Sequence, residues 1–150
     1  MKILIAVDDS PQAGRAARFV AGMRWPAGSR VIVAAVVRAA TPAPGMAGGV
    51  EAADAIADLH QRFSSALHRA RDLLRAAGLS TEERLVQGDA RERLLEMVEA
   101  ERVDLLVLGS RGHNRLLRLL LGSVSSHAVT HARCSVLVMK GNRHRTGAGG

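Results

Sequence analysis

Glycine and serine residues gather in one segment toward the C-terminal end of the chain. Gly109, Gly112 and Gly122 are separated by two and nine residues, and Ser123 and Ser125 follow at the expected start of a helix. The first N–H groups of a helix have no partner within it, and together with the helix dipole they favour an anion such as phosphate. Glycine lets such an anion approach the backbone closely. The segment therefore predicts a phosphate-binding loop.

Arginine side chains add positive charge to the same loop, at Arg111, Arg115 and Arg118. The loop matches neither the Walker A pattern nor the GxGxxG fingerprint. The alternative is structural: the glycines serve only to turn the chain, and Ser123 only caps a helix. The glycine residues alone leave both interpretations open.

Short apolar runs alternate with helical segments along the chain, and these elements must position the loop. The expected strands are residues 2–7, 31–37, 80–87, 104–108 and 135–139. The expected helices are residues 11–21, about 50–77, 89–101 and 122–132. This alternation predicts one α/β domain with a parallel sheet and helices on both faces. Ligands of such sheets bind beyond the carboxyl ends of the strands, where the glycine-rich segment begins.

The composition is that of one globular domain. The chain has 150 residues, 47% hydrophobic and 23% charged, which excludes a disordered or collagen-like chain. Its single cysteine, Cys134, excludes an internal disulfide framework. Its apolar runs fall short of the roughly 20 residues of a membrane span, and the first run stops too early for a secretory signal. We therefore expect a cytoplasmic protein, with an ordered domain at residues 1–140 and a disordered basic tail at 141–150.

The positive charge raises the alternative of a nucleic-acid-binding module. The formal net charge is +7, and a basic balance suits nucleic acid, a membrane surface or an anionic ligand. Proteins that bind single strands usually offer aromatic side chains for stacking. This chain has no tyrosine, two phenylalanines and one tryptophan, which weighs against nucleic acid.

Other residues with reactive side chains favour structural interpretations. His127 and His131 have the spacing of a metal pair on a helix, but no nearby acid or cysteine completes a site, so a solvated helix face is the simpler interpretation. His113 is expected to be a solvated loop residue rather than a γ-phosphate contact. Cys134 is expected to be a buried, inert thiol.

Two adjacent acids, Asp8 and Asp9, follow the first expected strand and also resemble the metal-binding pair of a response-regulator receiver. That resemblance implies a third aspartate at the end of the third strand. Residues 50–77 are expected to be helical instead, and Gly109 ends the strand that most resembles the acceptor strand. The receiver interpretation is therefore rejected.

The complete pattern Gly-x2-Gly-x9-Gly-Ser, which begins at Gly109, resembles the nucleotide-binding motif of the universal stress protein family. The Val-Ser-Ser that follows it, the closing strand Ser-Val-Leu-Val-Met and the opening Ile-Leu-Ile-Ala-Val-Asp-Asp-Ser are similar to that family as well. The resemblance covers residues 2–140. It implies a Rossmann-like three-layer sandwich of the adenine nucleotide alpha hydrolase-like kind, with a five-stranded parallel sheet in the order 3-2-1-4-5 and two helices on each face.

The resemblance also implies the ATP-binding branch, since the other branch lacks the glycine motif. The positions implied to contact ATP are Ala6, Val7, Asp8, Val36, Leu108, Gly109, Arg111, Gly112, Gly122, Ser123, Val124 and Ser125. Those from 111 onward surround the phosphates, with Ser125 added on its chemistry as a hydroxyl donor. Gly109 lies near the ribose, and Asp8 contacts the ribose or a Mg²⁺ ion. The remaining strand residues wall the adenine and the nucleoside.

A homodimer formed through the last strand is a further implication of the resemblance. The apolar run Val136–Met139 at a sheet edge would need covering, which agrees with it. The expected function is regulatory or stress-protective, with ATP changing the affinity for a protein partner that the sequence does not name. The alternative from another class is a slow ATPase or phosphotransferase that uses Asp8, Asp9 and Arg111.

Overall fold

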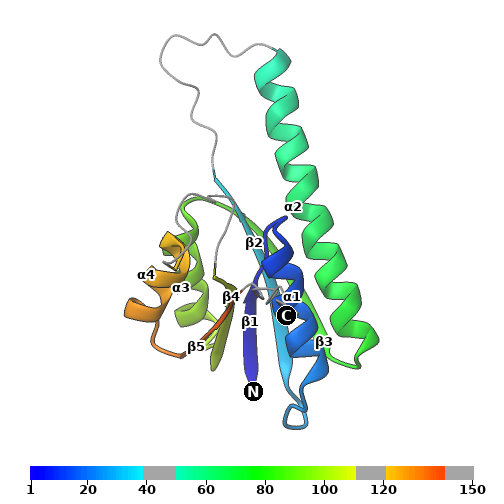
Figure 1. The fold of residues 1–150 in the computed structure, drawn as a ribbon, viewed down its shortest axis with the longest axis vertical. Coiled ribbons are helices and arrows are strands. Elements are labelled where there is room, and N and C mark those ends of the chain that lie inside the picture. The colour runs from blue at the N-terminus through cyan, green and yellow to red at the C-terminus, as the bar shows by residue number, and fades with distance from the viewer. Residues whose placement is uncertain (39–49, 111–120, 141–150) are drawn as a thin grey trace, which may run out of the picture.

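Five parallel strands form a single sheet in the order β3-β2-β1-β4-β5 (Figure 1). The computed structural model describes residues 1–38, 50–110 and 121–140. The strands are β1 (Lys2–Ala6), β2 (Arg30–Val37), β3 (Ser80–Gln87), β4 (Leu105–Gly109) and β5 (Ser135–Met139). The parallel sheet and its strand order confirm the fold class expected from the sequence.

The helices lie in two layers, one on each face of the sheet (Figure 1). They are α1 (Pro11–Gly22), α2 (Val50–Ala76), α3 (Ala90–Ala100) and α4 (Ser123–His131). Helices α1 and α2 pack on one face, and α3 and α4 on the other. Among the described residues, no helix is both long and apolar enough to cross a membrane.

The three interior strands β2, β1 and β4 are buried on both faces, which explains their continuous apolar sequences. In β1, Ile3 and Ile5 face the α1–α2 layer and Leu4 faces the α3–α4 layer, each with no exposed surface. In β4, Val107 and Leu106 divide between the two layers in the same way. Side chains of a strand alternate between its faces, so each interior strand contributes to both halves of the core.

Strand β3 is more polar because it lies at the edge of the sheet. It pairs with β2 along its whole length, from Ser80 to Gln87. Its contacts with α2 are polar: Arg71 donates to Glu83 at 3.2 Å, and Arg75 donates to Thr81 at 2.8 Å. Edge position and polar contacts account for a strand whose sequence lacks an apolar run.

Local signals set the ends of the helices. The Ser10 hydroxyl accepts a hydrogen bond from the Ala13 N–H and caps α1, as expected, with Pro11 in the first turn. Gly78 follows α2 with a φ of 81°, and the N–H groups of Gly78 and Leu79 donate to Arg75 and Leu74. This pair of bonds is a Schellman motif, in which glycine favours the left-handed conformation.

The cap of α3 differs from the capping box expected between Asp89 and Glu92. The Asp89 carboxylate accepts from the backbone N–H of Arg91 at 2.8 Å, and the Arg91 guanidinium also donates to it. The cap is therefore completed by the basic side chain of Arg91, two residues after Asp89 in the sequence. The spacing of the acidic residues does not predict this arrangement.

Acidification is expected to weaken this cap. The hydrogen bonds from Arg91 hold the pKa of Asp89 well below its ordinary value of 3.8. A carboxylate with a lowered pKa stabilises the fold above its unfolded-state pKa, and that stabilisation is lost as the pH falls from about 4 toward the folded-state pKa. We expect Asp89→Asn to be less stable than the wild type at pH 7, with a smaller difference at pH 3, as measured by urea unfolding at both values. An equal difference at both pH values would contradict this role for the charge.

Candidate functional site

The start of α4 is fastened to the end of β4 at the carboxyl edge of the sheet. Ser110 follows β4 directly, and its carbonyl accepts a hydrogen bond from the Gly122 N–H at 2.8 Å. The Ser125 hydroxyl lies 3.2 Å from the carbonyl oxygens of both Ser110 and Gly122. Ser110 and Ser125 are both buried. These bonds fix the helix start beside the last residue of β4.

Three N–H groups at this helix start have no backbone acceptor within the described part of the chain. Gly122 is the N-cap and has no side chain to close it, and the first bond within the helix runs from Ser126 to Gly122. The N–H groups of Ser123, Val124 and Ser125 therefore have no acceptor among the described residues. Ser123 is exposed, so solvent reaches this point. Unpaired donors at the positive end of a helix dipole suit an anion.

The Ser125 side chain has a structural role in this arrangement. Its hydroxyl carries one proton, and both carbonyl oxygens within reach compete for it. A phosphate would have to displace these bonds to receive that proton. The backbone N–H of Ser125 remains available as a phosphate donor, whereas its side-chain hydroxyl is already engaged.

Asp8 lies at the end of β1, half-buried, and shapes the turn into α1. Its Oδ1 atom accepts from the Ser10 N–H at 3.0 Å. Its other oxygen has no partner among the described residues. No group of three or more His, Cys, Asp or Glu residues that could hold a metal occurs in residues 1–38, 50–110 and 121–140. A Mg²⁺ ion on Asp8 would therefore take its remaining ligands from phosphate and water, as Mg²⁺ commonly does.

Asp9 points to a different partner. Its Oδ2 atom accepts from both the Nε and Nη2 atoms of Arg62, which belongs to α2. The Asp9 hydrogen bond raises the pKa of Arg62, with the negative charge of Asp9 adding to the effect. This pair ties the β1–α1 turn to α2 at the carboxyl edge of the sheet.

Apolar side chains of the candidate site divide between the two faces of the sheet. Ala6, Val36 and Val124 are partly exposed and pack against the core under α3 and α4, where Leu108 is buried. The Val7 side chain is buried on the opposite face, under α1 and α2. Four of these residues therefore lie on one face of the sheet: Ala6, Val36, Leu108 and Val124. Only the backbone of Val7 is accessible from that face.

Gly109 has a packing role at the end of β4. A Cβ atom at this position would lie 3.0 Å from the Cβ of Gln12 and 3.6 Å from the backbone nitrogen of Ala13. The absence of a side chain lets the first turn of α1 approach the sheet. That close approach explains the glycine whether or not a ribose lies beside it.

We expect Gly109→Val to destabilise the fold by about 2 kcal/mol, because a side chain forced into a packed site typically costs 1–3 kcal/mol. Urea unfolding of the variant and the wild type measures the difference. Gly22→Val is the matched control, because a Cβ at Gly22 would meet no atom within 4 Å. Unchanged stability of Gly109→Val would contradict the placement of α1 against β4.

Part of the predicted phosphate loop lies outside the described residues. Arg111 and Gly112, which the sequence analysis assigns to the phosphates, belong to that part, as do His113, Arg115 and Arg118. Their roles stay predictions.

The remaining residues with reactive side chains are His127, His131 and Cys134. His127 and His131 stack with ring centroids 4.2 Å apart, and His131 Nδ1 lies 2.9 Å from the carbonyl oxygen of His127. Cys134 is partly rather than fully buried, contrary to expectation. Burial raises the pKa of its thiol, which disfavours the nucleophilic thiolate at neutral pH.

Sequence reasoning missed two residues that shape the site, Ser110 and Arg62. Ser110 carries no signal in the sequence, because its contribution is a backbone carbonyl. Arg62 lies on the exposed side of a helix, and only the tertiary contact with Asp9 separates it from the other arginines.

Comparison with known proteins decides the family. The model of the universal stress protein family matches residues 1–140. The chain belongs to the universal stress protein family. A relative from Thermus aquaticus, the universal stress protein in the QAH/OAS sulfhydrylase 3' region, is 32% identical over 139 residues, which cover 92% of this chain and 97% of the relative. The universal stress protein MJ0531 of Methanocaldococcus jannaschii is 30% identical to this chain. That match covers 55% of this chain and about half (48%) of the relative.

Solved structures of the universal stress protein family share the fold. The Methanocaldococcus jannaschii protein MJ0577 matches with a TM-score of 0.74 at 23% identity, over 95% of this chain and 96% of that one. A universal stress protein in complex with cAMP matches with a TM-score of 0.64 at 26% identity, over 93% of this chain and 96% of that one. The first likeness shows the fold alone, and the second structure holds an adenine nucleotide.

Proposed function

We propose that this universal stress protein binds an adenine nucleotide, with ATP and Mg²⁺ as the ligands, at the carboxyl edge of its sheet. The observation that carries the proposal is the start of α4, where the N–H groups of Ser123, Val124 and Ser125 have no acceptor in residues 1–38, 50–110 and 121–140. Phosphate oxygens would accept from these groups beside the dipole's positive end. Gly122 leaves the approach open because it has no side chain.

The strands supply the nucleoside side of the proposed site. The partly exposed Ala6 and Val36 give an apolar surface for the adenine, with backbone groups of Val7 beside them. Gly109 and the buried Leu108 end the neighbouring strand, where the ribose would lie. A related universal stress protein crystallised with cAMP supports an adenine nucleotide as the ligand class.

In the proposed site, charged side chains contact the ligand at both ends of its chain of phosphate groups. Asp8 keeps one carboxylate oxygen for the ribose or for Mg²⁺. Arg111 and Gly112 complete the site on the sequence pattern. The Asp9–Arg62 ion pair restrains the turn that carries Asp8.

A homodimer through β5 belongs to the same proposal. Strand β5 is the last in the sheet and pairs with β4 on one side. The N–H of Ser135 and the carbonyl of Met139 both bond toward β4, so alternation directs the backbone groups of Val136 and Val138 to the open edge. Open strand edges with apolar side chains favour pairing with another strand.

The proposed role is regulatory: nucleotide occupancy changes the affinity of the chain for a protein partner. Such a change requires that the partner bind the nucleotide-free and nucleotide-bound states differently. The proposal assigns no catalytic base.

Calorimetric titration of nucleotide-free protein with ATP, AMP, cAMP and GTP, each with Mg²⁺, tests the proposal. We expect saturable binding of the adenine nucleotides, tightest for ATP because its phosphates meet the free N–H groups, and weaker binding of GTP. Equal affinity for GTP would contradict the adenine surface. Absence of binding for all four nucleotides would overturn the proposed function.

A further inference from the structure

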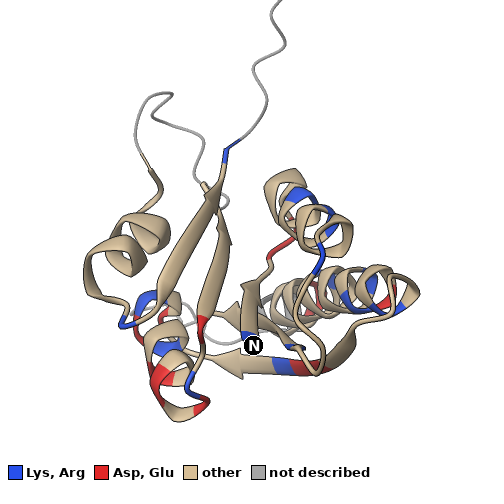
Figure 2. Ribbon diagram, turned by 90° about the horizontal axis from the view of Figure 1, so that it is seen from below, with Lys and Arg blue, Asp and Glu red and all other residues tan. Residues whose placement is uncertain are grey.

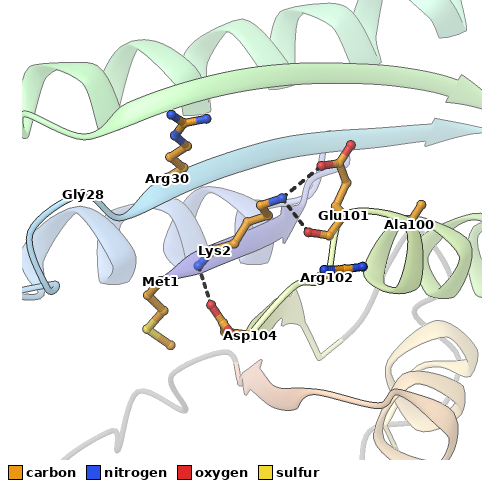
Figure 3. Close-up of a pocket in the computed structure, with 8 residues that line it drawn as sticks. All are labelled: Met1, Lys2, Gly28, Arg30, Ala100, Glu101, Arg102 and Asp104. Carbon is orange, nitrogen blue, oxygen red and sulfur yellow. Dashed lines mark hydrogen bonds and ion pairs between the residues drawn. The ribbon is translucent and has the colours of Figure 1, made fainter.

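Arginines without acidic partners surround α1. Residues 10–50 contain five arginines and no aspartate or glutamate. Three of the five lie on α1 or just after it, and none of these three forms an ion pair within residues 1–38, 50–110 and 121–140: Arg15, Arg18 and Arg24. Elsewhere in the described chain most basic side chains meet a carboxylate, as Lys2 meets Glu101 in Figure 3. The arginines of α1 are therefore open to an anionic partner.

The outer side of α1 combines this positive charge with an aromatic ring. The buried side chains of the helix share the side toward the sheet: Ala13, Ala16, Ala17 and Val20. Arg15, Arg18 and Phe19 are three and four residues apart, so they lie next to one another on the outer part of the helix. Figure 2 shows basic residues without acidic ones on α1, whereas α2 carries both kinds. The outer side of α1 is therefore basic and partly apolar.

Uncovered apolar side chains continue to the end of the helix. Phe19 is 39% exposed and is the only exposed phenylalanine or tryptophan in the part of the chain that the structure describes. Met23, the C-cap residue four positions later, is 44% exposed. Together with the arginines, these side chains make up the α1 surface: Arg15, Arg18, Phe19, Met23 and Arg24.

This combination distinguishes between the anionic partners that would suit the arginines. A bilayer with acidic lipids attracts basic side chains to its headgroups and takes up phenylalanine and other apolar side chains just below them. Nucleic acid offers phosphates to the arginines but no apolar layer for Phe19 and Met23. A single exposed aromatic ring is also too few for a row of stacked bases. The α1 surface therefore matches an acidic lipid membrane better than nucleic acid.

We propose that the α1 surface docks on membranes that contain acidic lipids. The protein lies on the bilayer, with its arginines at the lipid phosphates and Phe19 and Met23 inserted at the boundary between headgroups and acyl chains. Each basic residue near such a membrane strengthens binding about fivefold, so three arginines and two apolar side chains give weak, reversible docking. The proposal requires no bound nucleotide, so it stands or falls separately from the nucleotide site.

Sedimentation with lipid vesicles tests this docking on the nucleotide-free wild type. We expect binding to vesicles of mixed phosphatidylcholine and phosphatidylglycerol, weakened by added salt, and little binding to phosphatidylcholine alone. Arg18→Gln is expected to weaken the binding about fivefold. Arg30→Gln is the matched control, because Arg30 alternates onto the other face of the sheet with Ile32, and we expect it to change the binding little.

The insertion of apolar side chains is tested with a second pair of variants. Phe19→Ser is expected to weaken binding to the mixed vesicles severalfold, because a partly exposed ring no longer leaves water. Val129→Ser removes another exposed apolar side chain, on α4 under the other face of the sheet, and is expected to bind as the wild type does. Circular dichroism melting checks that all four variants remain folded.

Tryptophan fluorescence reports which surface meets the bilayer. Trp25 is the single tryptophan of the chain and follows Arg24 directly. We expect its fluorescence to be quenched when the mixed vesicles contain brominated phosphatidylcholine. Bound protein without quenching would overturn the assignment to the α1 surface.

The remaining outcomes decide the class of partner. Absence of sedimentation with the mixed vesicles at low salt would overturn the proposal, as would unchanged binding in both Arg18→Gln and Phe19→Ser. Duplex DNA, measured by fluorescence anisotropy at the same salt concentration, is the comparison ligand. Binding to DNA that Arg18→Gln weakens, without binding to the vesicles, would assign the surface to nucleic acid instead.

Discussion

Replacing Gly122 by valine is expected to reduce the affinity for ATP more than 100-fold. The branched side chain would cover the N–H groups of Ser123 and Val124, so the phosphates would lose hydrogen bonds that contribute about 1.5–3 kcal/mol each when one partner is charged. Two such bonds account for a loss of this size, since 1.4 kcal/mol is tenfold in affinity. Calorimetry of nucleotide-free wild type and variant measures the ratio.

The backbone at Gly122 makes this variant informative. Its φ of −61° and ψ of 161° are extended values that valine also adopts, so the backbone conformation at this position accommodates the substitution. Gly22→Val is the control for adding a side chain at a glycine, because the space around it is open. Unchanged ATP affinity in a folded Gly122→Val protein would place the phosphates elsewhere.

Replacing Val138 by proline is expected to convert the proposed homodimer to a monomer. Proline removes the N–H that Val138 directs to the open edge of β5 and leaves the bonds with β4 in place, because those come from the alternate residues. Pairing of β5 with the β5 of a second copy would lose one of the two N–H donors that this strand directs to its open edge. Light scattering on a sizing column gives the mass of each protein.

The other edge of the sheet provides the control for this substitution. Gly88 donates to Val37 of β2, so alternation directs the backbone of Leu85 in β3 to the open side. Leu85→Pro is expected to remain dimeric. A dimeric Val138→Pro protein, or a monomeric wild type, would contradict assembly through β5.

The fold is predictable from the sequence because hydrophobic pattern and end signals agree. Continuous apolar runs locate β1, β2 and β4, whose side chains are buried on both faces. Ser10 and Gly78 mark helix ends by mechanisms that depend on nearby residues alone. Even the polar β3 is found in its correct place, since Gly78 ends the helix before it and Asp89 begins the helix after it.

The details of the site are less predictable because they depend on tertiary contacts. The sequence analysis groups Val7 with Ala6, whereas the alternation of a strand puts their side chains on opposite faces. Gly109 is predicted as a ribose neighbour, but its packing against Gln12 follows only from the path of α1. The Ser125 hydroxyl is predicted as a phosphate donor, and its bonds to two carbonyls come from the fold of the chain around Ser110.

A crystal structure of the chain grown with ATP and Mg²⁺ tests the central claim most directly. The account predicts phosphate oxygens within hydrogen-bond distance of the Ser123 and Val124 N–H groups, Mg²⁺ beside Asp8 and the adenine against Val36. A nucleotide bound anywhere else would contradict it, and so would an empty carboxyl edge at saturating ATP.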